Sequence, residues 1–211
     1  MLVFEFCAEN LTYIDMAIAA GAGRIELCDN LAVGGTTPSI GVINEAIKLT
    51  RAKSVDLCVI IRPRGGDFVY TDLEVEAMLT DIRAAKEIGV TCFVLGALTS
   101  DRKLDQKVMQ LLLAACGEAE VVFHMAFDEL AHTDQLEAIE WLSDQGVARI
   151  LTRGGNPGAT LEQRFAHYHR LLDAAKGKIQ ILPGGGVTLD NRQLFLEQLG
   201  VCQLHGTRIV F

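Results

Sequence analysis

Basic residues are scarce in this 211-residue chain. Its 19 lysines and arginines stand against 27 aspartates and glutamates, which gives a formal net charge of −8. A nucleic-acid-binding domain usually carries a clustered basic face, and the sequence has no such cluster. We therefore expect no nucleic-acid partner.

Long apolar runs are also lacking. No run approaches the roughly 18 residues that a membrane-spanning helix needs. The first seven residues contain a glutamate and no basic segment, unlike a secretion signal. These absences predict no membrane partner and a cytoplasmic location.

Cysteine and glycine are present without the common cofactor motifs. None of the six cysteines forms Cys-x-x-Cys, so neither a zinc knuckle nor a thioredoxin-type redox motif is present. No Gly-x-Gly-x-x-Gly follows the first apolar run, and there is no NAD, flavin or PLP signature. In a cytosol the thiols stay reduced. Cys58, Cys92 and Cys116 lie within apolar runs, which predicts buried small side chains.

Half of the residues are apolar, which is enough for a sizeable core, and a recurring pattern organises them. At four places an amphipathic stretch ends near a glycine and leads into a short apolar run: residues 20–27, 88–95, 145–151 and 199–204. A glycine at a helix C-terminus adopts the left-handed conformation and lets the chain turn into a strand. The repeat therefore indicates alternating helices and strands.

Short apolar runs predict eight strands, at residues 3–7, 24–28, 55–61, 92–96, 121–124, 149–152, 179–182 and 202–205. Helical periodicity predicts seven helices, at residues 11–20, 40–50, 73–88, 105–115, 134–145, 161–175 and 190–199. Strict alternation indicates a parallel sheet with right-handed crossovers. Eight strands favour a closed (β/α)8, TIM-like barrel over an open doubly wound sheet.

The barrel is expected to occupy residues 1–211 as a single domain whose eighth helix is absent or very short. The chain stops at Phe211, a few residues after the last predicted strand. Because an exposed apolar flank near this end needs cover, we also expect a homo-oligomer.

Strand side chains alternate between two faces, which predicts what the barrel encloses. In the first strand Glu5 and Cys7 share one face, and in the second Glu26 and Cys28 do. Because the helices must cover the apolar faces, these four side chains should point inward. An unpaired buried glutamate costs several kcal/mol or more, so a cation must lie nearby.

Arg62, Arg64 or a metal ion could supply that positive charge. By the same alternation Arg62, His124 and His205 also point inward. Acids, a guanidinium and imidazoles thus converge at the carboxyl ends of the strands, where barrel proteins keep their sites. A self-satisfied Glu–Arg cluster explains the two glutamates about equally well.

Glycine pairs or triplets follow the second, third, sixth and seventh strands, whereas turns on the opposite face lack them. This distribution indicates a ligand mouth whose backbone can approach an anion. Arg64 could instead pair with Asp67 within its own loop. The candidate anion- or substrate-binding residues are Thr36, Arg62, Arg64, Asp67, Gly154, Gly155, Gly184, Gly185, Gly186 and His205.

Five stretches carry a resemblance to a known family: residues 26–31, 34–39 (Gly-Gly-Thr-Thr-Pro-Ser), 61–70 (Ile-Arg-Pro-Arg-Gly-Gly-Asp-Phe-Val-Tyr), 123–128 and 183–186. They resemble the CutC family of copper homeostasis proteins along essentially the whole chain. The resemblance implies a (β/α)8 barrel, a cytoplasmic location and copper binding, with Cys7 and Cys28 as the matching ligands. Met125 stands where the family usually has arginine, and Arg153 where it usually has serine.

Two hypotheses follow. In the first, Cys7 and Cys28 bind Cu(I), because soft thiolates favour this ion and adjacent strands lie about 4.8 Å apart. In the second, the barrel is an enzyme acting on a small anionic or phosphorylated metabolite. Its acid–base groups would be Glu5, Glu26, His124 and Asp128. A scaffold or storage barrel without chemistry is a third possibility, since fold does not fix function.

Overall fold

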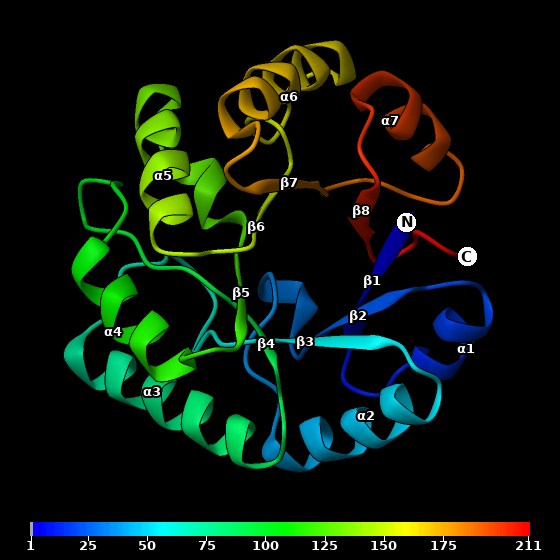
Figure 1. The fold of residues 1–211 in the computed structure, drawn as a ribbon, viewed down its shortest axis with the longest axis vertical. Coiled ribbons are helices and arrows are strands. Elements are labelled where there is room, and N and C mark those ends of the chain that lie inside the picture. Colours follow the sequence, from blue (N-terminus) through cyan, green and yellow to red (C-terminus); the bar gives the residue numbers. More distant parts are fainter. Residues whose placement is uncertain (1) are drawn as a thin grey trace.

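The computed structural model describes residues 2–211, and within them eight parallel strands form one sheet. Each strand except the last is followed by an α-helix (Figure 1). The strands are β1 (Val3–Glu9), β2 (Arg24–Cys28), β3 (Asp56–Ile60), β4 (Cys92–Leu95), β5 (Glu120–Phe123), β6 (Arg149–Thr152), β7 (Gln180–Pro183) and β8 (Gln203–Gly206).

The helices form a ring outside the strands (Figure 1). They are α1 (Ile14–Ala19), α2 (Ile40–Ala52), α3 (Asp72–Glu87), α4 (Gln106–Cys116), α5 (His132–Asp144), α6 (Leu161–Ala175) and α7 (Arg192–Leu199). Two 3-10 turns follow β2 and β5, at η1 (Leu31–Val33) and η2 (Met125–Glu129). Capping boxes at Thr71 and Thr160 fix the starts of α3 and α6, because each threonine accepts a backbone N–H of the first turn.

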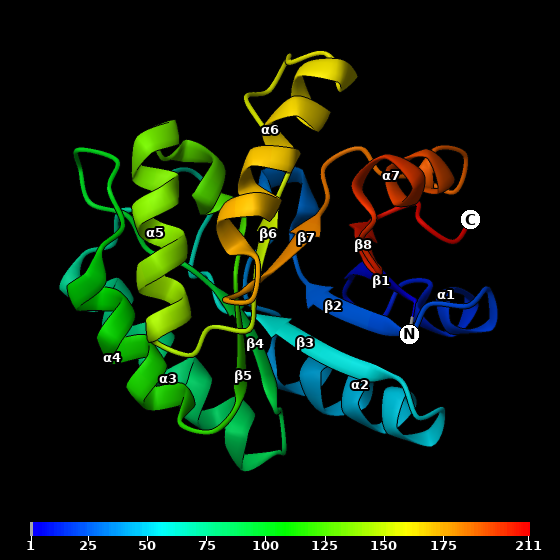
Figure 2. The same cartoon turned by 45° about the horizontal axis from the view of Figure 1, so that its top comes forward.

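The strand order is β7-β6-β5-β4-β3-β2-β1-β8, so β7 and β8 are the two ends of the sheet. The sheet curls until these ends lie side by side, where Gln203 Nε2 donates to Gln180 Oε1 at 2.6 Å. The turned view shows the nearly closed ring (Figure 2). The predicted TIM-like barrel is confirmed.

Two apolar clusters hold this barrel together. The larger one fills the layer between the strands and the helices and includes Phe93, Phe123 and Tyr168. The smaller one lies inside the barrel and is rich in sulfur: Cys7, Cys28, Cys58, Ile60, Cys92, Val94, Val122, Leu151 and Leu182, with Leu31 and Met125 packed against them. The inward set follows the period of two along each strand.

Three helix starts differ from the sequence-based expectation. Helix α5 begins at His132, two residues before the expected start, so Asp134 lies in its first turn. Helix α1 begins only at Ile14, because Tyr13 adopts a left-handed conformation with φ of 63°. Helix α7 begins at Arg192. Within residues 2–211 no helix is long and apolar enough to cross a membrane.

No eighth helix follows β8 in the described chain, as expected. The C-terminal tail instead runs between α7 and α1 (Figures 1 and 2). The ring of Phe211 lies 5.3 Å from that of Phe6 and 6.0 Å from that of Tyr13, centroid to centroid. Tyr13, Met16 and Phe211 leave exposed apolar surface on this flank, so the homo-oligomer stays a prediction.

This aromatic contact predicts a stability effect. Phe211→Ala should lower the free energy of unfolding by about 1–2 kcal/mol, because part of a phenylalanine side chain loses its packing on Phe6 and Tyr13. Leu73→Ala on α3 is the control, since Leu73 is 84% exposed. Denaturant unfolding of both variants gives the comparison. Equal effects of the two substitutions would show that the C-terminal tail does not stabilise the flank where an eighth helix would otherwise pack.

Candidate functional site

A chamber of about 260 Å³ opens at the carboxyl ends of the strands. Its walls come from β1, β2, β3, β6 and β8 and from the loops after β2, β3, β5, β7 and β8, so residues distant in sequence meet there. The lining residues are Cys7, Glu26, Cys28, Leu31, Gly34, Ile60, Arg62, Phe68, His124, Met125, Leu151, Gly185, Gly186, Val187, Thr188, His205, Gly206, Thr207 and Arg208.

Two thiols form one wall of the chamber. Cys7 pairs in register with Glu26 of the neighbouring strand, which places Cys28 two residues further along on the same face. The two sulfur atoms lie 3.8 Å apart, and both side chains are buried. The expectation that Cys7 and Cys28 face a shared interior is met in this geometry.

Glu5 lies below the thiols and is buried with two cationic partners. Its carboxylate accepts hydrogen bonds from Arg24 Nε and, at 2.7 Å, from His205 Nδ1. Burial opposes ionisation, yet these two partners lower the pKa of Glu5 to about 2. The positively charged partners of Glu5 are therefore Arg24 and His205.

Glu26 and His205 complete the polar wall. His205 Nε2 lies 3.5 Å from a carboxylate oxygen of Glu26. Burial opposes protonation of His205, but the side chains of Glu26, Cys7 and Glu5 raise its pKa well above the ordinary value. Ligand atoms of Cys7, Glu26 and His205 all lie within 4.8 Å of one another. A thiol, a carboxyl and an imidazole thus converge on one point.

The two thiols differ in their protonation. A hydrogen bond from the Cys28 thiol, which outweighs burial, lowers the pKa of Cys7 to about 5. The same bond, with burial, raises the pKa of Cys28 well above its usual value. Burial and the neighbouring Cys7 raise the pKa of Glu26. The shared hydrogen bond therefore favours ionisation of Cys7 over ionisation of Cys28.

Neither Arg62 nor Arg64 forms an ion pair with the two buried glutamates, contrary to the expectation from sequence. Arg62 Nη1 and Nη2 donate to the carbonyl oxygens of Val33, Gly35 and Gly66, and so join the loops after β2 and β3. These acceptors belong to loops whose backbone path the sequence does not reveal.

Arg64 lies away from the chamber lining. Its guanidinium pairs with Glu74 and, at 3.0 Å, with Asp67, and it also donates to the carbonyl of Val69. The alternative in which Arg64 and Asp67 satisfy each other within one loop matches this geometry. Neither Arg64 nor Asp67 lines the chamber.

Two buried donors in the chamber wall have no partner in the described chain. They are Arg62 Nε and His124 Nε2, and both side chains are almost fully buried. Burial and the charge of Arg62 lower the pKa of His124 to about 3, so its imidazole is neutral. His124 Nδ1 accepts from the Ala126 N–H at 3.3 Å, which places the proton on Nε2. Both orphaned groups are therefore hydrogen-bond donors.

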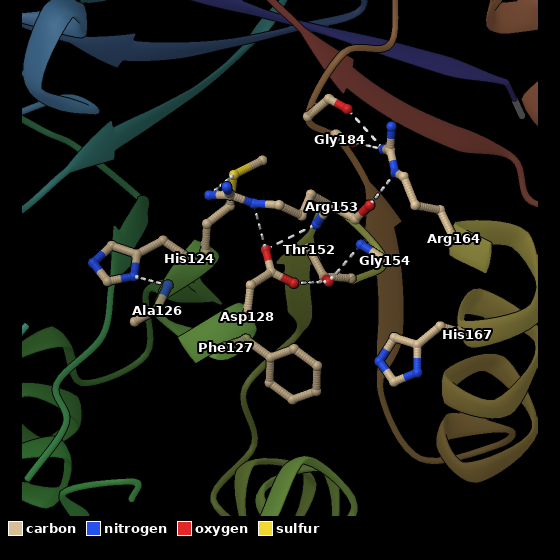
Figure 3. A network of polar contacts seen from close by, with 12 residues as sticks. His124, Ala126, Phe127, Asp128, Thr152, Arg153, Gly154, Arg164, His167 and Gly184 are labelled. Atoms are coloured by element: carbon tan, nitrogen blue, oxygen red, sulfur yellow. Dashed lines mark hydrogen bonds and ion pairs between the residues drawn. The ribbon is translucent and has the colours of Figure 1, made fainter. Parts of the chain in front are cut away.

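The structure separates Asp128 from His124 (Figure 3). Asp128 lies behind the chamber wall, where it accepts from Thr152 Oγ1, from the Arg153 N–H at 2.9 Å and from Arg153 Nε at 3.3 Å. Burial raises the pKa of Asp128 to about 6 in spite of these bonds. Asp128 anchors Arg153, and no contact joins it to the imidazole of His124 among the described residues.

Of the other candidate anion-binding residues, some line the chamber and some lie behind its lining. Gly185, Gly186 and His205 line the chamber. Thr36 bridges to Asp29 in the loop after β2, outside the lining. The remaining members also lie behind the lining: Gly154 against the ring of Tyr168, Gly155 after it, and Gly184 against Leu151, His205 and Met125.

Met125 and Arg153, the two departures from the family pattern, are in contact. Met125 lines the chamber, whereas Arg153 does not. An amine nitrogen of the Arg153 guanidinium lies 3.8 Å from the Met125 sulfur. Asp128 therefore holds the Arg153 charge next to a methionine that lines the chamber.

Three arginines were missed from sequence. Arg24 shares the inward parity of Glu26 and Cys28, so the period of two could have found it. Arg149 shares the parity of Leu151 and lies inside the barrel, with its Nη2 3.8 Å from the Cys58 sulfur and 3.6 Å from that of Cys92. Arg208 follows β8 and lines the chamber, and no periodic signal marks it.

Fold and site together define a (β/α)8 barrel with a sulfur-lined chamber at its mouth. The CutC family model matches residues 2–210, and the chain belongs to the CutC family. A CutC family protein of Enterococcus faecalis is 49% identical over 99% of this chain and all of its own. The mouse copper homeostasis protein cutC homolog is 42% identical over 96% of this chain and 72% of its own length.

Solved structures agree with this assignment. A CutC protein from Streptococcus agalactiae superposes with a TM-score of 0.95 at 46% identity, covering 99% of this chain and all of that one. A deoxyribose phosphate aldolase from Aeropyrum pernix superposes with a TM-score of 0.67 at 13% identity, covering 97% of this chain and 84% of that one. The latter likeness concerns the barrel fold alone.

The buried ion pair predicts a large effect on stability. Arg24→Met should lower the free energy of unfolding by about 3–5 kcal/mol, because it removes a charged partner of buried Glu5. Lys48→Met is the control, since Lys48 and Glu45 form an exposed pair and its loss should matter little. Chemical denaturation at neutral pH compares them. A small change for Arg24→Met would contradict the assigned role.

The environment of Asp128 predicts a pH dependence. Its pKa of about 6 in the folded protein exceeds the unfolded value of about 3.9, so the folded state binds more protons between these values. The Asp128 carboxyl should therefore lower stability by about 2 kcal/mol as the pH rises from about 4 to about 7. The fall in stability over this pH range should be smaller by that amount in Asp128→Asn and unchanged in the exposed control Asp144→Asn. Parallel pH profiles for wild type and Asp128→Asn would refute it.

Proposed function

We propose that the protein binds Cu(I) at the mouth of the barrel through the sulfurs of Cys7 and Cys28, as part of cytoplasmic copper homeostasis. The observation that carries the proposal is the 3.8 Å separation of two buried, unoxidised sulfur atoms facing one chamber. Soft thiolates select Cu(I) over hard cations. Family membership supports copper as the ion, because curated relatives are named copper homeostasis proteins.

The separation of the sulfur atoms suits a shared soft ion. The sulfurs of Cys7 and Cys28 lie 3.8 Å apart, so both could bind the same Cu(I). Neighbouring side chains of the chamber could supply a third ligand. The thiol of Cys7, whose pKa is lowered, would ionise more readily than that of Cys28, and Cys28 would lose its proton on binding.

His205 is the best-placed third ligand, and its Nε2 would lose its proton when it binds the ion. Its Nδ1 contacts the Glu5 carboxylate at 2.7 Å, which fixes the ring, and its Nε2 faces Glu26 and Cys7. A carboxylate that accepts from one ring nitrogen while the other binds a metal is a common arrangement in proteins. Glu5 would therefore position His205, and Arg24 would hold Glu5.

The surroundings suit a soft ion that must be kept from water. Ile60, Leu151 and Leu182 of the inner cluster pack beside the thiols, and Met125 adds a thioether at the rim. All six cysteines are free, and five of them are buried. This thiol content supports placement in a reducing compartment such as the cytosol.

A competition titration tests the proposal. Under anaerobic, reducing conditions the wild-type protein should take one Cu(I) per chain from a chromogenic chelator. Cys7→Ser or Cys28→Ser should weaken binding by at least about 100-fold, because each removes one of two thiolate ligands. His205→Gln should weaken it less, by about 10-fold.

Cys202→Ser is the matched control, because Cys202 is the exposed cysteine and lies outside the chamber. Its Cu(I) affinity should equal that of wild type. Tight one-to-one binding retained in the Cys7→Ser/Cys28→Ser double variant would overturn the proposal, and circular dichroism shows whether each variant is folded.

A further inference from the structure

The loop after β7 turns three consecutive carbonyl groups away from the chamber. Arg164 Nη2 donates to the carbonyl oxygen of Gly184 at 3.0 Å and to that of Gly185 at 2.7 Å. Asn191 Nδ2 donates to the carbonyl oxygen of Gly186 at 2.9 Å. Figure 3 shows Arg164 reaching Gly184 from α6. All three carbonyls are therefore satisfied from the helix side of the loop.

The amide groups of the same peptides must then point the other way. No cis peptide bond occurs in residues 2–211, so each N–H lies opposite the carbonyl of its own peptide. The amides concerned are those of Gly185, Gly186 and Val187, which all line the chamber. None of the three takes part in a hydrogen bond formed within the described chain. They are three unpaired donors at one wall.

Glycine is required for this arrangement. Gly185 and Gly186 adopt positive φ angles of 65° and 84°, which side chains rarely allow. A Cβ at Gly185 would also lie 2.6 Å from the Cβ of Arg153. Successive amides presented in this way form an anion-binding concavity.

Arg208 adds a positive charge beside the three amides. Its carbonyl accepts from the Leu189 N–H at 2.7 Å, and it bridges to Thr188, so its backbone is tied to the glycine loop. Its side chain is exposed, lines the chamber and forms no ion pair with the described residues. In contrast, Arg62 donates from both terminal nitrogens to carbonyl oxygens, and Arg164 donates to carbonyl oxygens from Nε and Nη2.

We propose that the amides of Gly185, Gly186 and Val187, together with the Arg208 guanidinium, bind the phosphate group of a small organic phosphate ester. Three amides and a guanidinium that line one chamber suit the three terminal oxygens of a phosphate better than the two of a carboxylate. In parallel barrels the loops after the seventh and eighth strands are favourable for such a group.

The rest of the chamber accommodates the organic part. A volume of about 260 Å³ is many times the roughly 30 Å³ share of one water molecule, so it holds more than a free phosphate. Its walls offer the apolar side chains of Leu31, Phe68 and Leu151. The orphaned donors Arg62 Nε and His124 Nε2 call for acceptor atoms such as hydroxyl or carbonyl oxygens.

This inference is independent of copper binding. The loop after β7 lies next to His205, because a Cβ on Gly184 would come within 3.1 Å of that ring, but no proposed phosphate donor is a thiol. The Cys7→Ser/Cys28→Ser double variant should therefore bind phosphate esters as wild type does, so failure of one proposal leaves the other standing.

Amide NMR tests the subsite directly. Titration of ¹⁵N-labelled protein with glycerol 2-phosphate should shift the amide signals of Gly185, Gly186 and Val187 to saturation. Inorganic phosphate should shift the same signals with at least about threefold weaker affinity, because it leaves the apolar walls empty. Absence of saturable shifts at these amides would overturn the subsite, and equal affinities would overturn the assignment to an ester.

Substitution of the arginine separates a built site from general attraction of anions. Arg208→Gln should weaken glycerol 2-phosphate binding by at least about tenfold, because it removes the charged donor. Arg83→Gln, on the exposed face of α3, removes the same formal charge far from the loop and should leave the affinity unchanged. Equal affinity in the two variants would contradict the proposal, and their amide spectra also report whether each is folded.

Discussion

A carboxylate buried at the centre of the barrel needs positive partners, and this need organises the site. Glu5 is taken out of water, so it stays ionised only because Arg24 and His205 bind its two oxygens. That demand fixes the orientation of the His205 ring. The oriented ring in turn lies beside Cys7 and Glu26, so the electrostatics of the thiol wall depend on an ion pair one layer below it.

A second wall of the chamber, formed by the glycine loop after β7 beside His205, depends on the direction of its peptide groups. Arg164 and Asn191 bind carbonyl oxygens of the glycine loop from outside, and the amides of that loop face inward as a consequence. One wall therefore offers soft sulfur ligands and the other offers hydrogen-bond donors and a guanidinium. A barrel that only bound a metal through two sulfurs would not need the second wall.

Much of this arrangement follows from the periodicity of the sequence. Alternation along the first two strands places Glu5, Cys7, Glu26 and Cys28 inward, because the helices must cover the apolar faces. The same rule applied to Arg24 would have identified the cation opposite Glu5. Glycine pairs after the strands indicated the ligand mouth, because such clusters occur at one end of the barrel only.

The hydrogen-bond partners that could not be predicted lie on loops distant in sequence, whose backbone course a local pattern does not reveal. Arg62 binds carbonyl oxygens from two different loops, and nothing local to its own motif reveals those acceptors. The separation of His124 from Asp128 has a similar cause, since η2 turns the carboxylate toward Thr152 on the next strand. Arg208 follows the last strand, where no periodic pattern reports which way a side chain points.

The central claim is that two inward thiols on neighbouring strands share one soft metal ion. X-ray absorption at the copper edge, on protein loaded anaerobically with one equivalent of Cu(I), tests it most directly. The account predicts a first coordination shell with two sulfur atoms and one lighter atom, and a shell with one sulfur in Cys28→Ser. A shell of nitrogen and oxygen alone, or one unchanged by that substitution, would contradict it.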